Sequence, residues 1–177
     1  MEAPAAAALI DEAAKKSDLL WLRAPAAHGA GHARSQPVWH VWQDGAGYVV
    51  SGGLEQPVPA DITDRAVVTL RSKDKRNRLI TFEASVTVLA PGSEAWETVV
   101  PTLRAKRLNL PDVAQATERW ARESTVWRLE PTGVVLETPD DPSVESHATP
   151  PPPSPARSRV PRPLHLRGRP SKNRGGH

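Results

Sequence analysis

The clearest pattern along the chain is an alternation of apolar and polar residues with a period of two, which is typical of strands that bury one face. It is longest over Leu79–Leu89, where Ile80, Phe82 and Ala84 are flanked by Thr81 and other polar residues. Shorter apolar or alternating runs lie at 19–22, 66–70, 125–129 and 134–136. Together with the stretch described next, these runs predict six or seven strands.

A tryptophan-rich stretch, Pro37–Gly53, predicts a hairpin around which the other elements are organised. Trp39 and Val41 fall on one face of its first strand, and Val38, His40 and Trp42 fall on the other. The Asp-Gly pair within Gln43–Gly47 is a turn signal, and a second strand follows it. That strand ends in small residues, whose backbone can lie close to a ligand.

Three segments carry apolar residues at helical spacing and predict peripheral helices: Pro4–Lys16, a segment that begins at Ser93, and Asp112–Glu123. Pro101 lies inside the second of them and predicts a kink or a division into two helices. Six or seven strands with so few helices predict a closed or nearly closed antiparallel barrel, because an open sheet would leave its edges exposed.

The composition changes near Pro139. Ten of the 19 prolines lie from Pro139 onward, and Ser146–His177 holds seven basic residues and no acidic one. Such a segment cannot bury enough apolar surface to offset the entropy of ordering. We therefore expect two parts, a barrel domain over 1–138 and a disordered, basic, Pro/Arg-rich tail over 139–177. The formal net charge of the chain is +3. The positive charge comes from the tail, because the domain is mildly acidic.

The absence of cysteine excludes disulfides, thiol nucleophiles and cysteine zinc sites, and it fits a reducing cytosol. No apolar run approaches the roughly 18 residues that a membrane span needs. The first residues lack the basic region of a secretory signal. These features favour a soluble cytoplasmic protein that does not contact a membrane.

PVWHVWQDGAGYVVSGG, followed by EQPVP, SKDKRNRLITFEA and KRLN, resembles the pyridoxamine 5′-phosphate oxidase-like FMN-binding split barrels, and more closely a small actinobacterial subgroup of them. The resemblance covers roughly Ser17 to Gly133. It implies a split β-barrel of antiparallel strands that forms a homodimer and binds FMN or a deazaflavin at the dimer interface. A flavin-dependent oxidoreductase is the activity that it implies, although the sequence leaves open whether the protein is an enzyme.

The resemblance also implies the residues that would hold the cofactor. A flavin needs a flat apolar wall, donors for its polar edge and cations for its phosphate. The ring-side candidates are Trp39, His40, Val41, Ser51, Gly52, Gly53 and Gln56. The phosphate-side candidates are Arg71, Ser72, Lys73 and Arg78. Glu55 stands where many members of the family have a basic residue, which disfavours a true pyridoxamine phosphate oxidase.

Two other functions stay open at the level of sequence. Glu55 also motivates a barrel that has lost its cofactor and serves as a dimeric binding or scaffold protein. Arg167–Pro170 is similar to the centre of an AT-hook and motivates weak DNA contact through the tail.

The remaining candidates have simpler interpretations. His28 and His32 lie in a glycine-rich segment without a third ligand, so we expect a loop and no metal. No catalytic residue is assigned, because a lone strand histidine such as His40 is more often simply packed than reactive. The tryptophans outside the hairpin are interpreted as packing residues: Trp21, Trp96, Trp120 and Trp127.

Overall fold

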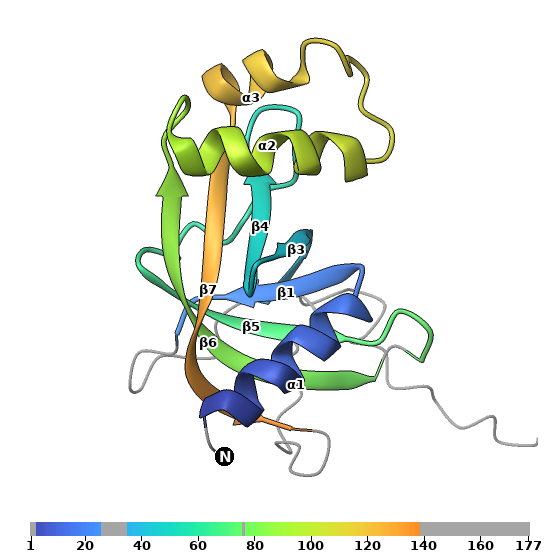
Figure 1. Cartoon of the computed structure of the whole chain (residues 1–177), viewed down its shortest axis with the longest axis vertical. Coiled ribbons are helices and arrows are strands. Elements are labelled where there is room, and N and C mark those ends of the chain that lie inside the picture. The colour runs from blue at the N-terminus through green and yellow to red at the C-terminus, as the bar shows by residue number, and fades with distance from the viewer. Residues whose placement is uncertain (1–2, 26–34, 76, 139–177) are drawn as a thin grey trace, which may run out of the picture.

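The computed structural model describes residues 3–25, 35–75 and 77–138, and its main feature is a curled sheet of seven antiparallel strands (Figure 1). The strands run β2-β1-β5-β6-β7-β4-β3 across the sheet. Their bounds are β1 Leu19–Arg23, β2 Gln36–Trp39, β3 Val41–Gln43, β4 Ala46–Ser51, β5 Arg65–Arg71, β6 Arg78–Leu89 and β7 Thr125–Glu137. The helices of this part of the chain are α1 Ala3–Lys15, α2 Glu94–Lys106 and α3 Ala116–Glu123. The predicted fold class, a mainly β antiparallel barrel with peripheral helices, is confirmed.

The two edge strands of the sheet are consecutive in the chain. β2 pairs with β1, β3 pairs with β4, and only His40 separates β2 from β3. The stretch Gln36–Gln43 thus runs along both edges and brings them together. The predicted single strand is interrupted at His40, because there the chain leaves one neighbour and joins another. The Asp-Gly turn is confirmed: Asp44 and Gly45, with φ of 50° and 74°, join β3 to β4.

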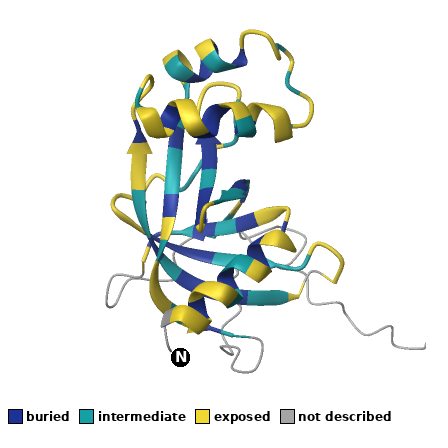
Figure 2. Cartoon of the chain, viewed as in Figure 1, coloured by how far each residue is buried: buried dark blue, intermediate teal, exposed yellow. Residues whose placement is uncertain are grey.

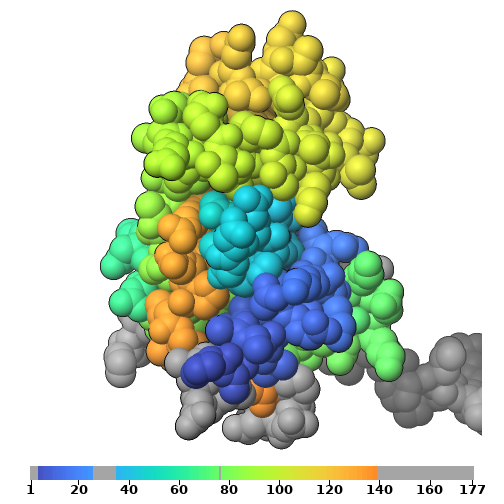
Figure 3. Space-filling view, in the orientation of Figure 1, coloured from blue at the N-terminus to red at the C-terminus, as the bar shows by residue number. Residues whose placement is uncertain are grey.

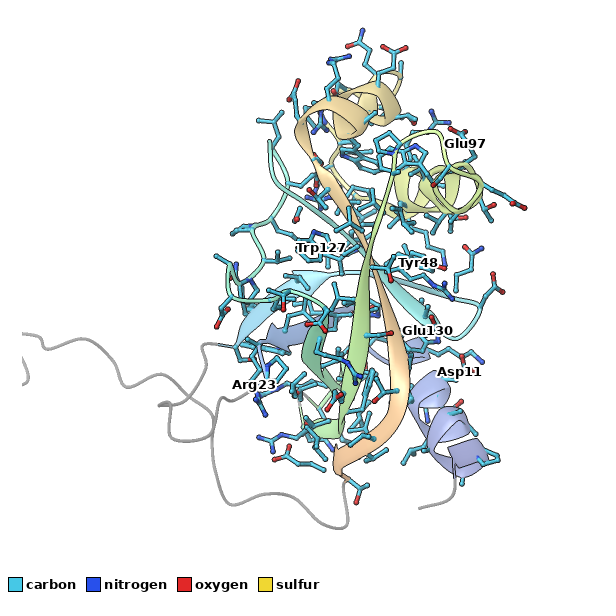
Figure 4. All side chains as sticks on the ribbon, turned by 90° about the vertical axis from the view of Figure 1, so that its left-hand side faces the viewer. Asp11, Arg23, Tyr48, Glu97, Trp127 and Glu130 are labelled. Atoms are coloured by element: carbon cyan, nitrogen blue, oxygen red, sulfur yellow. The ribbon has the colours of Figure 1, made fainter. Side chains whose placement is uncertain are left out.

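The sheet buries apolar side chains on both of its faces. The inner core fills the barrel and includes Leu20, Val38 and Phe82, with α1 packed against it. Figure 1 shows α1 lying across this side of the sheet. The Trp42 indole N–H donates to Asp11 of α1 over 2.8 Å, and Asp11 is labelled in Figure 4. This bond fixes the helix on the barrel.

The outer core lies between the sheet and the pair α2 and α3, which cross the ends of β4, β6 and β7 (Figure 1). Trp96 of α2 and Trp120 of α3 are buried in it, as predicted for packing residues. Figure 2 shows that the faces of α2 and α3 turned away from the sheet are exposed. Trp39 and Val41 belong to this core, whereas Val38 and Trp42 belong to the inner one, so the predicted faces are correct.

Three boundary predictions are wrong. The predicted division at Pro101 does not occur: α2 is one helix, because the buried face that includes Val100 and Leu103 holds it together despite the missing backbone donor. The alternative, a kink at Pro101, stays a prediction. α3 begins at Ala116 and not at Asp112. The last two predicted strands form the single strand β7, in which irregular pairing with β6 takes up the turn residues around Gly133.

Candidate functional site

A pocket of about 370 Å³ lies where the α1–β1 turn meets the end of β5. Such a volume is within the range of small-molecule sites. Antiparallel pairing of Leu20 with Leu70 brings the two segments together although they are far apart in the chain. In Figure 3 the blue start of the chain and the green residues after β5 lie side by side. The pocket is lined by Asp18, Leu19, Trp21, Arg71, Ser72 and Lys73.

The charges of this pocket favour an anion. Arg71 and Lys73 contribute two cations, against one carboxylate from Asp18. The Arg71 guanidinium lies over the Trp21 ring, with its central carbon 4.9 Å from the ring centroid. The Nε atom of Arg71 is buried and has no hydrogen-bond partner among the described residues. An unpaired donor of this kind is a reason to expect an acceptor from a ligand or from water.

Three of the four phosphate-side candidates, Arg71, Ser72 and Lys73, therefore meet in one pocket. Arg78 pairs with Glu137, which also accepts a hydrogen bond from Thr81 over 2.8 Å, and does not line the pocket. Trp21 was interpreted as a packing residue, but it lines the pocket. Trp21 lies two residues after Leu19, so both side chains project from the same face of β1, and the structure shows Leu19 exposed on that face. The spacing of two is the signal that was available in the sequence.

None of the ring-side candidates lines this pocket; they lie on the hairpin and, for Gln56, just after it. The amide of Gln56 accepts from the Trp39 backbone N–H (2.7 Å) and donates to the Trp39 carbonyl (2.8 Å), as a neighbouring strand would. The Arg107 guanidinium lies 5.5 Å from the centroid of the Trp39 ring. Val41 is a fully buried member of the outer core. Trp39 is linked to the pocket through Leu19, its direct partner across β1 and β2.

His40 is buried at the junction of β2 and β3. Loss of hydration on burial lowers the pKa of its imidazole from 6.5 to about 4, opposed by the charge of Asp18 and reinforced by that of Lys106. Its Nδ1 atom has no hydrogen-bond partner among the described residues. The imidazole is therefore neutral at pH 7.

The small residues at the end of β4 approach another segment of the chain itself. A Cβ at Gly53 would lie 3.1 Å from the Glu123 carbonyl, and Gly52 has the same carbonyl as its nearest neighbour. Ser124 donates from its hydroxyl to the Gly52 carbonyl over 3.1 Å. Ser51 accepts from the indole N–H of Trp127 over 2.6 Å; Trp127 is labelled in Figure 4. These residues fasten β4 to the junction of α3 and β7.

Glu55, which stands at the position of the missing cation, is part of a buried ion cluster. Its carboxylate accepts from Arg107 (3.1 Å), Arg119 (3.3 Å) and the indole N–H of Trp120 (2.9 Å). Arg119 also makes two bonds to Asp112, of 2.8 and 3.0 Å, which raise the pKa of Arg119 and lower that of Asp112. Sequence reasoning missed this cluster because its members are spread over a long stretch of the chain.

Over the described residues, no group of three or more histidine and carboxylate side chains is arranged to hold a metal ion. His28 and His32 lie outside these residues. The helices that the structure describes include none long and apolar enough to span a bilayer.

These features define the class of the protein by fold alone, an antiparallel split barrel. No protein-family model matches the sequence. No curated protein matches it either. The evidence from known proteins therefore comes from solved structures.

HutZ, the heme storage protein of Vibrio cholerae, matches with a TM-score of 0.51 and 14% identity, over 72% of this chain and 90% of that one. A Listeria innocua protein proposed to be a pyridoxamine 5′-phosphate oxidase has a TM-score of 0.48 and 10% identity, over 73% and 97% of the two chains. An FAD-binding protein of Mesorhizobium loti has a TM-score of 0.46 and 12% identity, over 76% and 91%. At 14% identity the match to HutZ shows the fold alone, and the two matches with a TM-score below 0.5 support no conclusion about this chain.

Proposed function

We propose that this chain binds a flavin-type cofactor, FMN or a deazaflavin, with its phosphate at Arg71, Ser72 and Lys73. The observation that carries the proposal is the pocket in which these residues meet, with the buried and unpaired Nε atom of Arg71. An arginine and a lysine at one end of a concave site suit a phosphate monoester. The apolar side chains of Leu19 and Trp21 in the same pocket suit an aromatic ligand.

The ring-side candidates do not line the pocket in which the phosphate-side candidates meet. Gly52 and Gly53 are exposed, and the Glu123 carbonyl lies beside them. We keep the ring-side candidates because Trp39 adjoins Leu19 of the pocket: Trp39, His40, Val41, Ser51, Gly52, Gly53 and Gln56. A bound flavin would supply the electron-transfer chemistry, and the residues of the chain would bind and orient it.

The wider assignment follows from the resemblance. We propose a cytoplasmic homodimer that acts as an oxidoreductase, with the cofactor near the interface of the two copies. Exposed apolar side chains on the strands, Leu19, Val88, Val134 and Leu136, give such a dimer surface to bury.

The test is the absorbance spectrum of the freshly purified protein, followed by titration with FMN and with a deazaflavin while tryptophan fluorescence is recorded. We expect saturable quenching with a dissociation constant of about 1–50 µM, which corresponds to about 6–8 kcal/mol. Arg71→Gln should weaken binding at least tenfold, whereas Lys75→Gln, in the same turn but outside the pocket, should leave it unchanged. Absence of saturable binding with both cofactors would reject the proposal.

A second candidate is a dimeric scaffold without cofactor. The ion-paired Glu55 favours it, because a buried carboxylate stands where the resemblance leads one to expect a phosphate-binding cation. A yellow protein as purified would exclude this candidate.

DNA contact through the tail is a separate prediction that lies outside the described residues. It predicts salt-sensitive binding to duplex DNA that is lost on deletion of residues 146–177.

A further inference from the structure

Two residues fix the position of Arg71, and the first is Ser17. Its hydroxyl lies 2.8 Å from the Arg71 carbonyl and 2.7 Å from the Leu19 carbonyl, and it accepts from the Arg71 backbone N–H over 3.3 Å. Ser17 is 7% exposed. One buried hydroxyl thus joins the α1–β1 turn to the end of β5, the two segments that form the pocket.

The second residue is Trp21, whose ring lies under the guanidinium of Arg71 at 4.9 Å. A guanidinium stacked on an indole is held by its face, while its N–H groups point outward in its own plane. The side chain is therefore oriented without using the donors that an oxyanion needs. A free arginine would lose rotamer entropy on binding, and an arginine already held loses less.

The backbone donors near the pocket are already used. The N–H of Ser72 donates to the Asn77 carbonyl over 2.9 Å, and the N–H of Lys73 donates to the Lys16 carbonyl over 3.1 Å. Anion binding there depends on side chains, namely Arg71, Ser72 and Lys73. Asp18, on the same pocket, opposes it.

We propose that Ser17 and Trp21 are positioning residues that hold Arg71 for a phosphate monoester, and that Asp18 limits the affinity of the pocket for it. The inference rests on the proposed function, since the phosphate is that of the flavin-type cofactor. It adds the residues that determine selectivity for the phosphorylated form of the ligand over the form without phosphate.

The experiment compares FMN with riboflavin, which lacks the phosphate, by fluorescence titration of the full chain. The readout is the ratio of the two affinities, because a general loss of structure lowers both and leaves the ratio unchanged. Trp21→Leu should lower the ratio about fivefold, and Trp21→Phe, which keeps an aromatic face, should lower it less. Trp127→Phe changes a tryptophan outside the pocket and is the matched control.

Three further variants test the roles of Ser17, Asp18 and the Arg71 guanidinium. Ser17→Ala should lower the ratio about threefold, since it removes one net hydrogen bond that locates Arg71. Asp18→Asn should raise the ratio about twofold to fivefold, because it removes a like charge from the pocket. Arg71→Lys, which keeps the charge but not the planar fork, should lie between wild type and Arg71→Gln.

The outcomes separate the two proposals. If riboflavin and FMN both bind and the ratio is the same in wild type, Trp21→Leu and Ser17→Ala, the inference is overturned and flavin binding stands. If neither ligand binds to the wild-type protein, the proposed function fails and the inference falls with it. A ratio that falls in the Trp21 and Ser17 variants, and not in Trp127→Phe, supports both.

Discussion

At the scale of single residues, the structure gives several polar groups surroundings that the sequence does not disclose. Glu55 shows this most clearly: only 4% of its side chain is exposed, and it lies between two arginines. Ion pairs of this kind add little net stability compared with apolar packing, but removing one partner leaves the other charge buried. The consequence can be measured.

Glu55→Gln should lower the free energy of unfolding by about 2–4 kcal/mol, because Arg119 loses part of its compensation in a buried site. Glu118→Gln, an exposed position on α3, should change it by less than about 0.5 kcal/mol. Denaturation with urea measures both. Equal, small changes would show that the cluster is hydrated and not buried.

His40 should make the stability of the domain depend on pH. Its folded pKa of about 4 lies below the ordinary value of 6.5, so the unfolded chain binds the proton more readily. The contribution of the neutral, buried imidazole to the free energy of unfolding is complete above pH 6.5. It is lost as the pH decreases from 6.5 to about 4, by up to roughly 3 kcal/mol. His40→Gln should lack this part of the slope in denaturation curves at pH 7, 5.5 and 4.5. Parallel curves for variant and wild type would contradict a buried neutral imidazole.

At the scale of elements, the end of β4 depends on how closely it approaches the junction of α3 and β7. Gly53 has φ of 61° and lies near the Glu123 carbonyl, whereas Gly45 has φ of 74° with nothing around its missing side chain. The two glycines share the same backbone requirement and differ in the contact. They therefore form a matched pair.

Gly53→Ala should destabilise the domain by about 2–3 kcal/mol, and Gly45→Ala by about 1 kcal/mol. Thermal or urea denaturation gives both values. The difference between them measures the close approach alone. A difference near zero would mean that Glu123 moves aside without cost.

The same elements show what could be predicted from sequence and what could not. The long alternation of β6, the Asp-Gly turn and the faces of Trp39 and Trp42 follow from local pattern, so they were predicted correctly. The length of β7 and the break at His40 depend on which strands become neighbours, and the chain alone does not reveal that. The pocket residues divide in the same way. Arg71, Ser72 and Lys73 were predicted from their charge and polarity. Trp21 and Ser17 come close to Arg71 only because β1 pairs with β5, which the local sequence does not reveal.

At the scale of the whole molecule, the described residues form one barrel with a helix on one side and a helical pair at the strand ends (Figure 1). Over the described residues, the two hydrophobic cores draw on positions 9 to 135. A domain that ends near residue 138 stays a prediction.

Deletion of residues 139–177 should leave the midpoint of thermal unfolding within about 2 °C of that of the full chain, because the composition of the tail opposes stable packing. Differential scanning calorimetry of the two proteins checks this. A drop of more than about 5 °C, corresponding to roughly 1 kcal/mol in a domain of this size, would assign the tail a structural role.

The placement of β2 and β3 at opposite edges of the sheet has a further consequence. A single proteolytic cut between Trp39 and Val41 would break the link between the two edge strands. If β2 and β3 then detached, one edge of β1 and one edge of β4 would be unpaired, while their other edges stayed paired with β5 and β7. Unpaired strand edges recruit other chains. We therefore expect cleavage at this site to promote aggregation, and the amide of Gln56, bonded to the Trp39 backbone, to oppose detachment of β2.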